Sequence, residues 1–138
     1  NAWCYGDPGV AATCWAAAER IGEPVDEWRD LALAAAARPE ADCLVEGAGL
    51  CHGAYGLAHL FNRCFQASGD ARFADASRRW FAHGLAIPLP REHDLMLGKS
   101  GIGLALLAAL GDEEPGWDRL LACDIPPMDH AAGGSDSV

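Results

Sequence analysis

The chain has 138 residues, of which 51% are apolar and 22% are charged, a composition that supports one folded domain and excludes a disordered chain. Its formal net charge is −10, which disfavours nucleic acid or an anionic membrane as a partner, because either would need a basic surface. An acidic surface is ordinary for a water-exposed protein and slightly favours a cationic peptide as a partner.

Helix signals dominate the first part of the chain. Asp7-Pro8 supplies a cap and a first-turn proline, and the apolar residues 10–21 predict a helix that ends at Gly22. Residues 26–37 predict a second helix, which Arg38-Pro39 ends.

The same pattern continues after this pair. An apolar face over residues 53–68 predicts a third helix with Gly69 as its stop. Asp70 is expected to cap a helix over residues 71–83, which Gly84 closes. No alternating run of β-branched residues predicts a strand.

Residues 100–110 and 117–122 predict a last pair of helices, and the three pairs form an internal repeat. A Gly-x-x-Gly segment opens each pair at Gly6, Gly53 and Gly98, at intervals of 47 and 45 residues. Hairpins repeated at about this period are typical of a solenoid or a closed ring. We therefore predict an all-α fold in which the glycine-rich helix of each pair is the inner one.

The residues just before these segments have side chains that bind metals. Cys4 aligns with Cys51, and Tyr5 aligns with His52, whereas the third repeat has Met96 at the cysteine position. Two thiolates and one imidazole suit zinc, and three protein ligands leave a fourth position open, as in catalytic sites. Cys4, Cys51 and His52 are therefore the predicted zinc ligands.

Two other interpretations of these residues stay open. In the first, Cys4 and Cys51 are small packing residues at tight turns, with His52 as a helix cap. In the second, a fourth ligand, for which Cys43 and His93 are the candidates, makes the site structural.

The remaining cysteines and histidines are expected to play no metal role. Helical, alanine-rich surroundings favour buried free thiols over disulfides, and a reducing cytoplasm fits them best. The remaining residues are Cys14, Cys64 and Cys123 as free thiols, His59 as a core residue, and His83 and His130 as solvated ones.

No stretch approaches the roughly 20 apolar residues that a membrane span needs.

Two motifs resemble the zinc motifs of the lanthionine synthetase C-like proteins, the cyclases of lantibiotic biosynthesis. They are Trp3-Cys4-Tyr5-Gly6-x-Pro8-Gly9 and Leu50-Cys51-His52-Gly53, the latter followed by Gly56-Leu57-Ala58-His59-Leu60. The stretches 98–110 and 115–121 resemble the C-terminal repeat of the same family, so the resemblance covers nearly the whole chain. Tyr5, together with the surroundings of the second motif, looks more like the stand-alone bacterial cyclases than the large bifunctional synthetases.

The resemblance implies an α/α toroid in which Cys4, Cys51 and His52 bind Zn²⁺. It also implies the reaction: a cysteine thiol of a dehydrated precursor peptide adds to dehydroalanine or dehydrobutyrine and closes a thioether ring. A dehydratase and a transporter are the further partners that it implies, and they would bring a cytoplasmic protein to the membrane.

The chain departs from the family in holding about three hairpins, roughly half of a toroid. The resemblance places the family's acid/base residues in the other half, so catalytic and substrate-binding residues remain unknown. We expect residues 1–125 to be the C-terminal part of a toroid, inactive alone and prone to self-association, and residues 126–138 to be a flexible tail. The alternatives are zinc-dependent addition of glutathione or another thiol to a different electrophile, and a non-catalytic, zinc-stabilised helical module that binds peptides.

Overall fold

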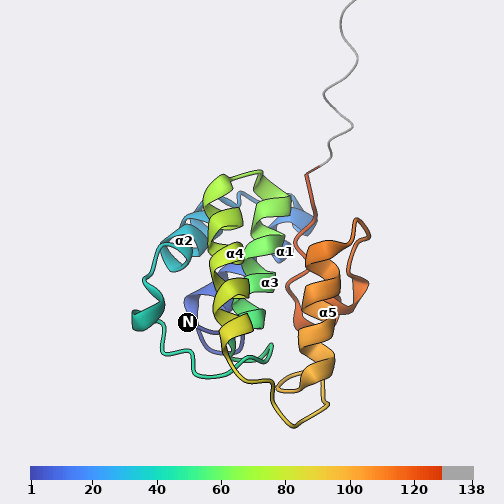
Figure 1. The fold of residues 1–138 in the computed structure, drawn as a ribbon. Coiled ribbons are helices and arrows are strands. Elements are labelled where there is room, and N and C mark those ends of the chain that lie inside the picture. The colour runs from blue at the N-terminus through green and yellow to red at the C-terminus, as the bar shows by residue number, and fades with distance from the viewer. Residues whose placement is uncertain (129–138) are drawn as a thin grey trace, which may run out of the picture.

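The structure is a computed structural model that describes residues 1–128, in which loops join a set of helices (Figure 1). Its only β-type pairing is an isolated bridge between Gly47 and Gly53. The predicted all-α class is confirmed. The elements in chain order are α1 (Asp7–Ile21), α2 (Asp26–Ala36), η1 (Glu40–Asp42), α3 (Ala54–Ser68), α4 (Ala71–Ala86), α5 (Lys99–Leu110) and η2 (Gly116–Leu121), where η marks a 3₁₀ helix.

The helices lie in two layers. Helix α3 contacts α1 on one side and α5 on the other, while α2 contacts α4 in the second layer. The α1–α2 and α3–α4 pairs are the first two predicted hairpins, and the glycine-rich member of each is the more buried one. This arrangement is the one expected for consecutive hairpins of an α/α toroid.

Local signals place most helix ends correctly. Gly22 (φ 73°) and Gly69 (φ 67°) end α1 and α3 in the left-handed conformation, which glycine adopts without a steric penalty. The Asp70 carboxylate caps α4 by accepting a hydrogen bond from the Arg72 amide at 3.0 Å. The predicted cap at Asp7 is wrong, because Gly6 is the N-cap and Asp7 lies in the first turn.

The predicted stop at Gly84 is also wrong, since α4 continues to Ala86. A Cβ at Gly84 would lie 2.7 Å from the Tyr55 ring of α3. Gly84 therefore allows two helices to approach closely and does not end one.

The third predicted hairpin is incomplete. Its second member is the short 3₁₀ helix η2, which follows Pro115 and ends at Leu121, before the backbone turns to φ 52° at Ala122. The Trp117 ring packs on His59 of α3, with ring centroids 4.6 Å apart, so η2 folds back over the inner layer. Consequently, α5 has no outer α-helix paired with it among the described residues.

Of the predicted tail, only its first three residues are described, and there the Met128 amide donates to the Gln66 carbonyl oxygen at 3.0 Å. Residues 129–138, including His130, lie outside the described part. None of the described helices is long and apolar enough to cross a bilayer.

The exposed side of α5 carries apolar side chains. Leu107 is 69% exposed and Leu110 is 84% exposed, and Leu120 of η2 is 80% exposed. Helix α5 contains no charged residue after Lys99. An apolar surface of this kind favours association between copies.

We therefore expect the chain to self-associate. Leu107→Gln combined with Leu110→Gln should raise the dissociation constant about tenfold or more, because the interface between copies would no longer bury two leucine side chains. Light scattering over a concentration series measures this. Leu44→Gln is the matched control, since Leu44 is 85% exposed but lies outside α5. A monomer at high micromolar concentration, with no binding of an apolar dye, would contradict the expectation.

Candidate metal centre

The loops that carry the predicted ligands in the first two repeats share a backbone contact with the equivalent loop of the third repeat. In each, a backbone carbonyl oxygen lies directly over a glycine in the first turn of the following helix. A Cβ on that glycine would lie 1.8 to 1.9 Å from the oxygen, so only glycine fits. The glycine and carbonyl pairs are Gly9 with Trp3, Gly56 with Leu50, and Gly101 with Leu95.

Backbone hydrogen bonds join these loops in order. The Cys4 amide donates to the Cys51 carbonyl oxygen at 3.3 Å, and the Cys51 amide donates to the Met96 carbonyl oxygen at 3.0 Å. Equivalent positions of successive repeats are therefore adjacent in space. This stacking explains how cysteines 47 residues apart in the sequence come together.

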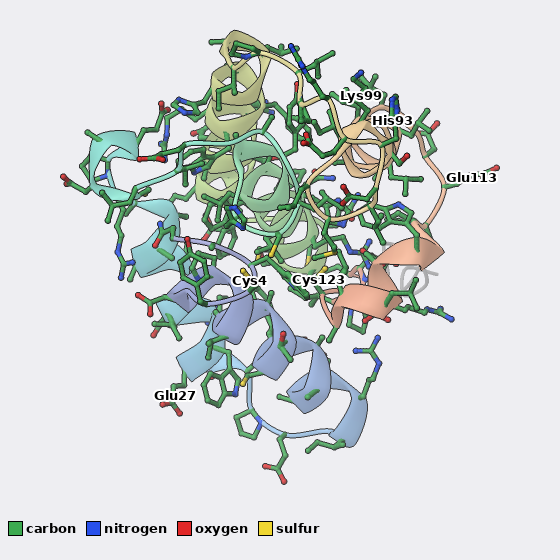
Figure 2. The ribbon with its side chains drawn as sticks, turned by 90° about the horizontal axis from the view of Figure 1, so that it is seen from below. Cys4, Glu27, His93, Lys99, Glu113 and Cys123 are labelled. Atoms are coloured by element: carbon green, nitrogen blue, oxygen red, sulfur yellow. The ribbon has the colours of Figure 1, made fainter. Side chains whose placement is uncertain are left out.

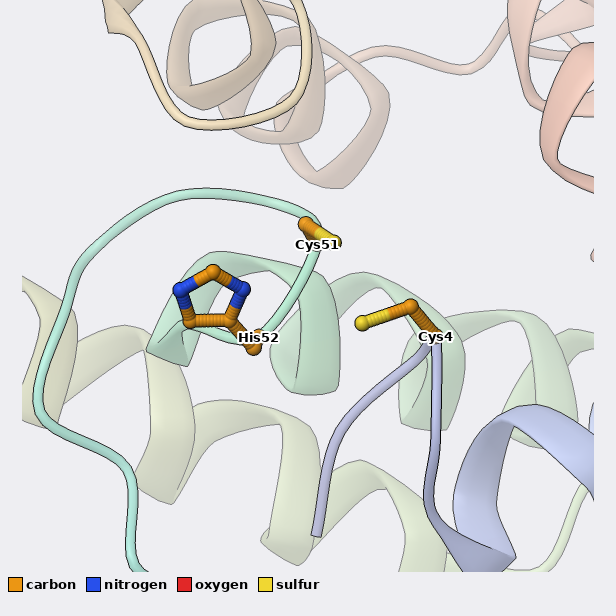
Figure 3. A group of neighbouring side chains, drawn as sticks. All are labelled: Cys4, Cys51 and His52. Carbon is orange, nitrogen blue, oxygen red and sulfur yellow. The ribbon is translucent and has the colours of Figure 1, made fainter.

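The predicted ligand atoms form one cluster. The sulfurs of Cys4 and Cys51 and a ring nitrogen of His52 all lie within 4.8 Å of one another (Figure 3). Ligand atoms of a tetrahedral zinc site are roughly 3.3–3.8 Å apart, so small side-chain rotations would suffice for all three to reach one ion. Cys4 and His52 are exposed and Cys51 is half-buried, which leaves one side of the cluster open to solvent.

The donor set also fits a divalent cation electrostatically. Burial, together with the hydrogen bond to Cys4 and the repulsion from its thiolate, raises the pKa of the Cys51 thiol to about 11. Two neighbouring thiols resist ionising together without a positive charge between them. A metal ion supplies that charge, since it binds sulfur as thiolate.

The comparison with known families agrees with this geometry. The profile of the family described as lanthionine synthetase C-like protein matches residues 1–122, which include both ligand loops and η2. The chain belongs to the lanthionine synthetase C-like family. This membership assigns a lanthionine synthetase-like function at the level of the family. No solved structure matches the chain.

The two candidate fourth ligands of this lanthionine synthetase C-like chain lie outside the cluster. Cys43 is buried, and its sulfur accepts a hydrogen bond from the Asn1 side-chain amide at 3.1 Å and donates one to the Pro39 carbonyl oxygen at 3.3 Å. His93 is exposed and is not among the clustered residues. The structure thus groups three protein ligands, the number expected of an open site. That they bind zinc stays a prediction.

Two other expectations about side chains are resolved by the structure. All six cysteines are free, although Cys14 is only half-buried. His83 is not simply solvated, because its Nδ1 lies 2.9 Å from a Glu40 carboxylate oxygen and its side chain is 31% exposed.

A second, fully buried cluster surrounds His59, which was expected to be a core residue. The Nε2 atom of His59 lies 3.1 Å from Oδ2 of Asp118, and Arg63 Nε lies 3.1 Å from the same oxygen. The Arg63 Nε–H is not aimed at this oxygen and has no hydrogen-bond partner, so the contact is ionic. Arg63 Nη2 donates instead to the Ile125 carbonyl oxygen at 2.8 Å.

Sequence reasoning missed the partners of His59. Asp118 and Arg63 are each completely buried. Cys123 forms a group with His59 and Asp118, in which the sulfur, a ring nitrogen and a carboxylate oxygen lie within 4.8 Å of one another. Burial, together with the Asp118 charge, raises the pKa of the Cys123 thiol well above its usual range, so this sulfur stays protonated. With its carboxylate beside both Arg63 and His59, this group forms a buried ion-pair network. The available signal was an aspartate directly after Trp117 and close to Leu120 and Leu121 in the sequence.

The buried network also supports the ligand loops. The Trp3 indole nitrogen, next to Cys4 in sequence, donates to the Leu121 carbonyl oxygen of η2 at 2.8 Å. Asp118 lies in the same 3₁₀ helix and is held by His59 of α3. The last repeat thus connects the first ligand loop to the helix that follows the second.

Proposed function

We propose that this chain carries the zinc site of a lanthionine cyclase, at which a cysteine thiol of a dehydrated precursor peptide is activated for addition to dehydroalanine or dehydrobutyrine. The observation that carries the proposal is the meeting of Cys4, Cys51 and His52, from two equivalent loops, within 4.8 Å. Family membership over residues 1–122 supports the reaction class.

The three residues would each have a defined role. Cys4 and Cys51 would bind the ion as thiolates, and His52 would bind it through one ring nitrogen. The ion, when bound, would lower the pKa of an incoming thiol and stabilise its thiolate, which is the nucleophile. The exposure of Cys4 and His52 leaves room for a peptide on the open side.

Tyr5 extends this open side. Its ring lies 6.4 Å from the His52 ring, centroid to centroid, with the two planes inclined by 30°. Because Tyr5 is 70% exposed, it offers an aromatic surface to a bound peptide beside the reacting thiol.

The reaction conserves mass. A bond forms between the thiol sulfur and the β-carbon of the dehydro residue, and the proton lost from sulfur is matched by one gained at the α-carbon. We assign no residue of the described part as the acid that delivers this proton.

A binding experiment with cobalt tests the proposal. The Co²⁺-loaded chain should change its visible spectrum when a cysteine peptide is added, because a third sulfur would enter the coordination sphere. The same peptide with serine in place of cysteine should leave the spectrum unchanged and bind about tenfold more weakly or worse, the equivalent of roughly 1.4 kcal/mol.

The alternatives give different results. A glutathione-specific thiol site would respond to glutathione and not to the cysteine peptide. A non-catalytic peptide-binding module would bind the cysteine and serine peptides equally well, and that outcome would contradict the proposal.

A further inference from the structure

A pocket of about 380 Å³ lies directly beside His52. The loop before α3 forms one wall, and the segment between α4 and α5 forms the other. The residues that shape it include Glu46, His52, Ile87, Pro88, Glu92 and Leu97. The pocket adjoins the cluster, since His52 belongs to both, and so lies within reach of a peptide whose cysteine binds there.

The pocket combines apolar walls with two carboxylates. Glu46 and Glu92 are exposed, and neither forms an ion pair with any residue among 1–128. No lysine or arginine lines the pocket. Ile87, Pro88 and Leu97 supply the apolar part. Two acidic residues without an ion-pair partner in the described part of the chain therefore line the same solvent-filled space.

The walls are held by the hydrogen bonds that also hold the ligand loop. The Met96 carbonyl oxygen accepts from the Leu50 amide at 2.8 Å and from the Cys51 amide at 3.0 Å. On the opposite wall, the Asp94 carboxylate accepts from the Leu97 amide at 2.8 Å, and the Glu92 carbonyl oxygen accepts from the Lys99 amide at 3.0 Å. The pocket and the predicted metal ligands thus belong to one hydrogen-bonded arrangement of loops.

A long basic side chain matches this chemistry. Lysine and arginine bury an apolar stem while their charged end stays at the rim, where it can meet the carboxylates. An acidic side chain would be repelled, and an apolar one would desolvate both carboxylates without compensating them. The overall charge of −10 attracts the same cationic class of peptide.

We infer that this pocket is a specificity subsite that binds a lysine or arginine of the precursor peptide close to the cysteine that reacts. The inference rests on the proposed function for the identity of the peptide. It goes further in naming the residue class that the chain selects next to the cysteine.

Methyl NMR of the 138-residue chain tests the subsite without any metal. The probes are three short peptides that contain lysine, norleucine or glutamate at the same position, each with serine in place of cysteine so that no sulfur can bind an ion. The lysine peptide should shift the Ile87 and Leu97 methyl signals and bind about three- to tenfold more tightly than the norleucine peptide, because two partly exposed charge pairs form.

Variants assign the preference to the two carboxylates. Glu46→Gln combined with Glu92→Gln should remove the lysine preference, and both side chains are exposed, so the fold should tolerate the change. Glu27→Gln is the control for a lost surface charge, since Figure 2 shows Glu27 on the opposite side of the molecule from His93, the neighbour of Glu92 in sequence. This control should keep the preference.

The outcomes separate this inference from the proposed function. Equal binding of the lysine and norleucine peptides, or shifts confined to methyl groups away from the pocket, would overturn the subsite. A lysine preference in a chain whose Co²⁺ form ignores cysteine peptides would leave the subsite standing and refute the proposed function. Thiol-dependent spectral changes without a lysine preference would support the proposed function and refute the subsite.

Discussion

Replacing Cys51 with alanine should lower the zinc content from about one ion per chain to almost none. Only two protein ligands would remain, whereas zinc sites in proteins use three or four. The affinity should fall by more than about 100-fold, because even groups that only hydrogen-bond to ligands contribute 10–100-fold. Elemental analysis after gel filtration, and titration with Co²⁺, measure both quantities.

Controls make this result specific. Cys4→Ala should behave like Cys51→Ala, because both sulfurs belong to the cluster. Cys14→Ala should keep its zinc, since Cys14 is a free, half-buried cysteine outside the cluster. If Cys4→Ala and Cys51→Ala both retained full zinc, these cysteines would be packing residues and the predicted site would be wrong.

Removing the Asp118 carboxylate should destabilise the fold by about 3 kcal/mol or more. Arg63 is completely buried, and Asp118→Ala would leave its charge without the buried anion beside it. Breaking a buried ion pair from one side typically costs 3–5 kcal/mol. We expect the lower end, because Glu114, whose side chain is 47% exposed, also pairs with Arg63. Urea denaturation followed by circular dichroism measures the loss.

The matched control is Asp75→Ala. Asp75 pairs with Arg78 at 3.0 Å, but both side chains are more than 70% exposed, so its removal should cost less than about 1 kcal/mol. Asp118→Asn should be milder than Asp118→Ala, because an amide can still accept a hydrogen bond from His59. A loss below about 1 kcal/mol for Asp118→Ala would show that Arg63 does not depend on this carboxylate.

The Asp118 change should also weaken metal binding. Helix η2 holds the Trp3 indole through the Leu121 carbonyl oxygen, and Trp3 precedes Cys4. Loosening η2 should therefore lower the Co²⁺ affinity, by about tenfold if η2 acts as other supporting groups of metal sites do. Asp75→Ala, which leaves η2 intact, should not change it.

The ligand cluster was predictable because the chain repeats itself. Aligning the three Gly-x-x-Gly segments is enough to place Cys4 opposite Cys51, and a backbone hydrogen bond joins these two positions in the fold. The helix ends at Gly22 and Gly69 were predictable for a similar reason, since they depend on backbone freedom at one residue. Signals of this kind lie within a few residues of the feature they determine.

The sequence by itself therefore determined the helical class, the repeat and the candidate ligands. Only the tertiary structure decided that Gly84 packs against Tyr55, that Asp118 meets His59 and Arg63, and that two glutamates line the pocket beside His52. His59 and Asp118 are 59 positions apart and belong to non-equivalent parts of their repeats. No local pattern marks such pairs, because burial and charge pairing arise only when distant elements pack together.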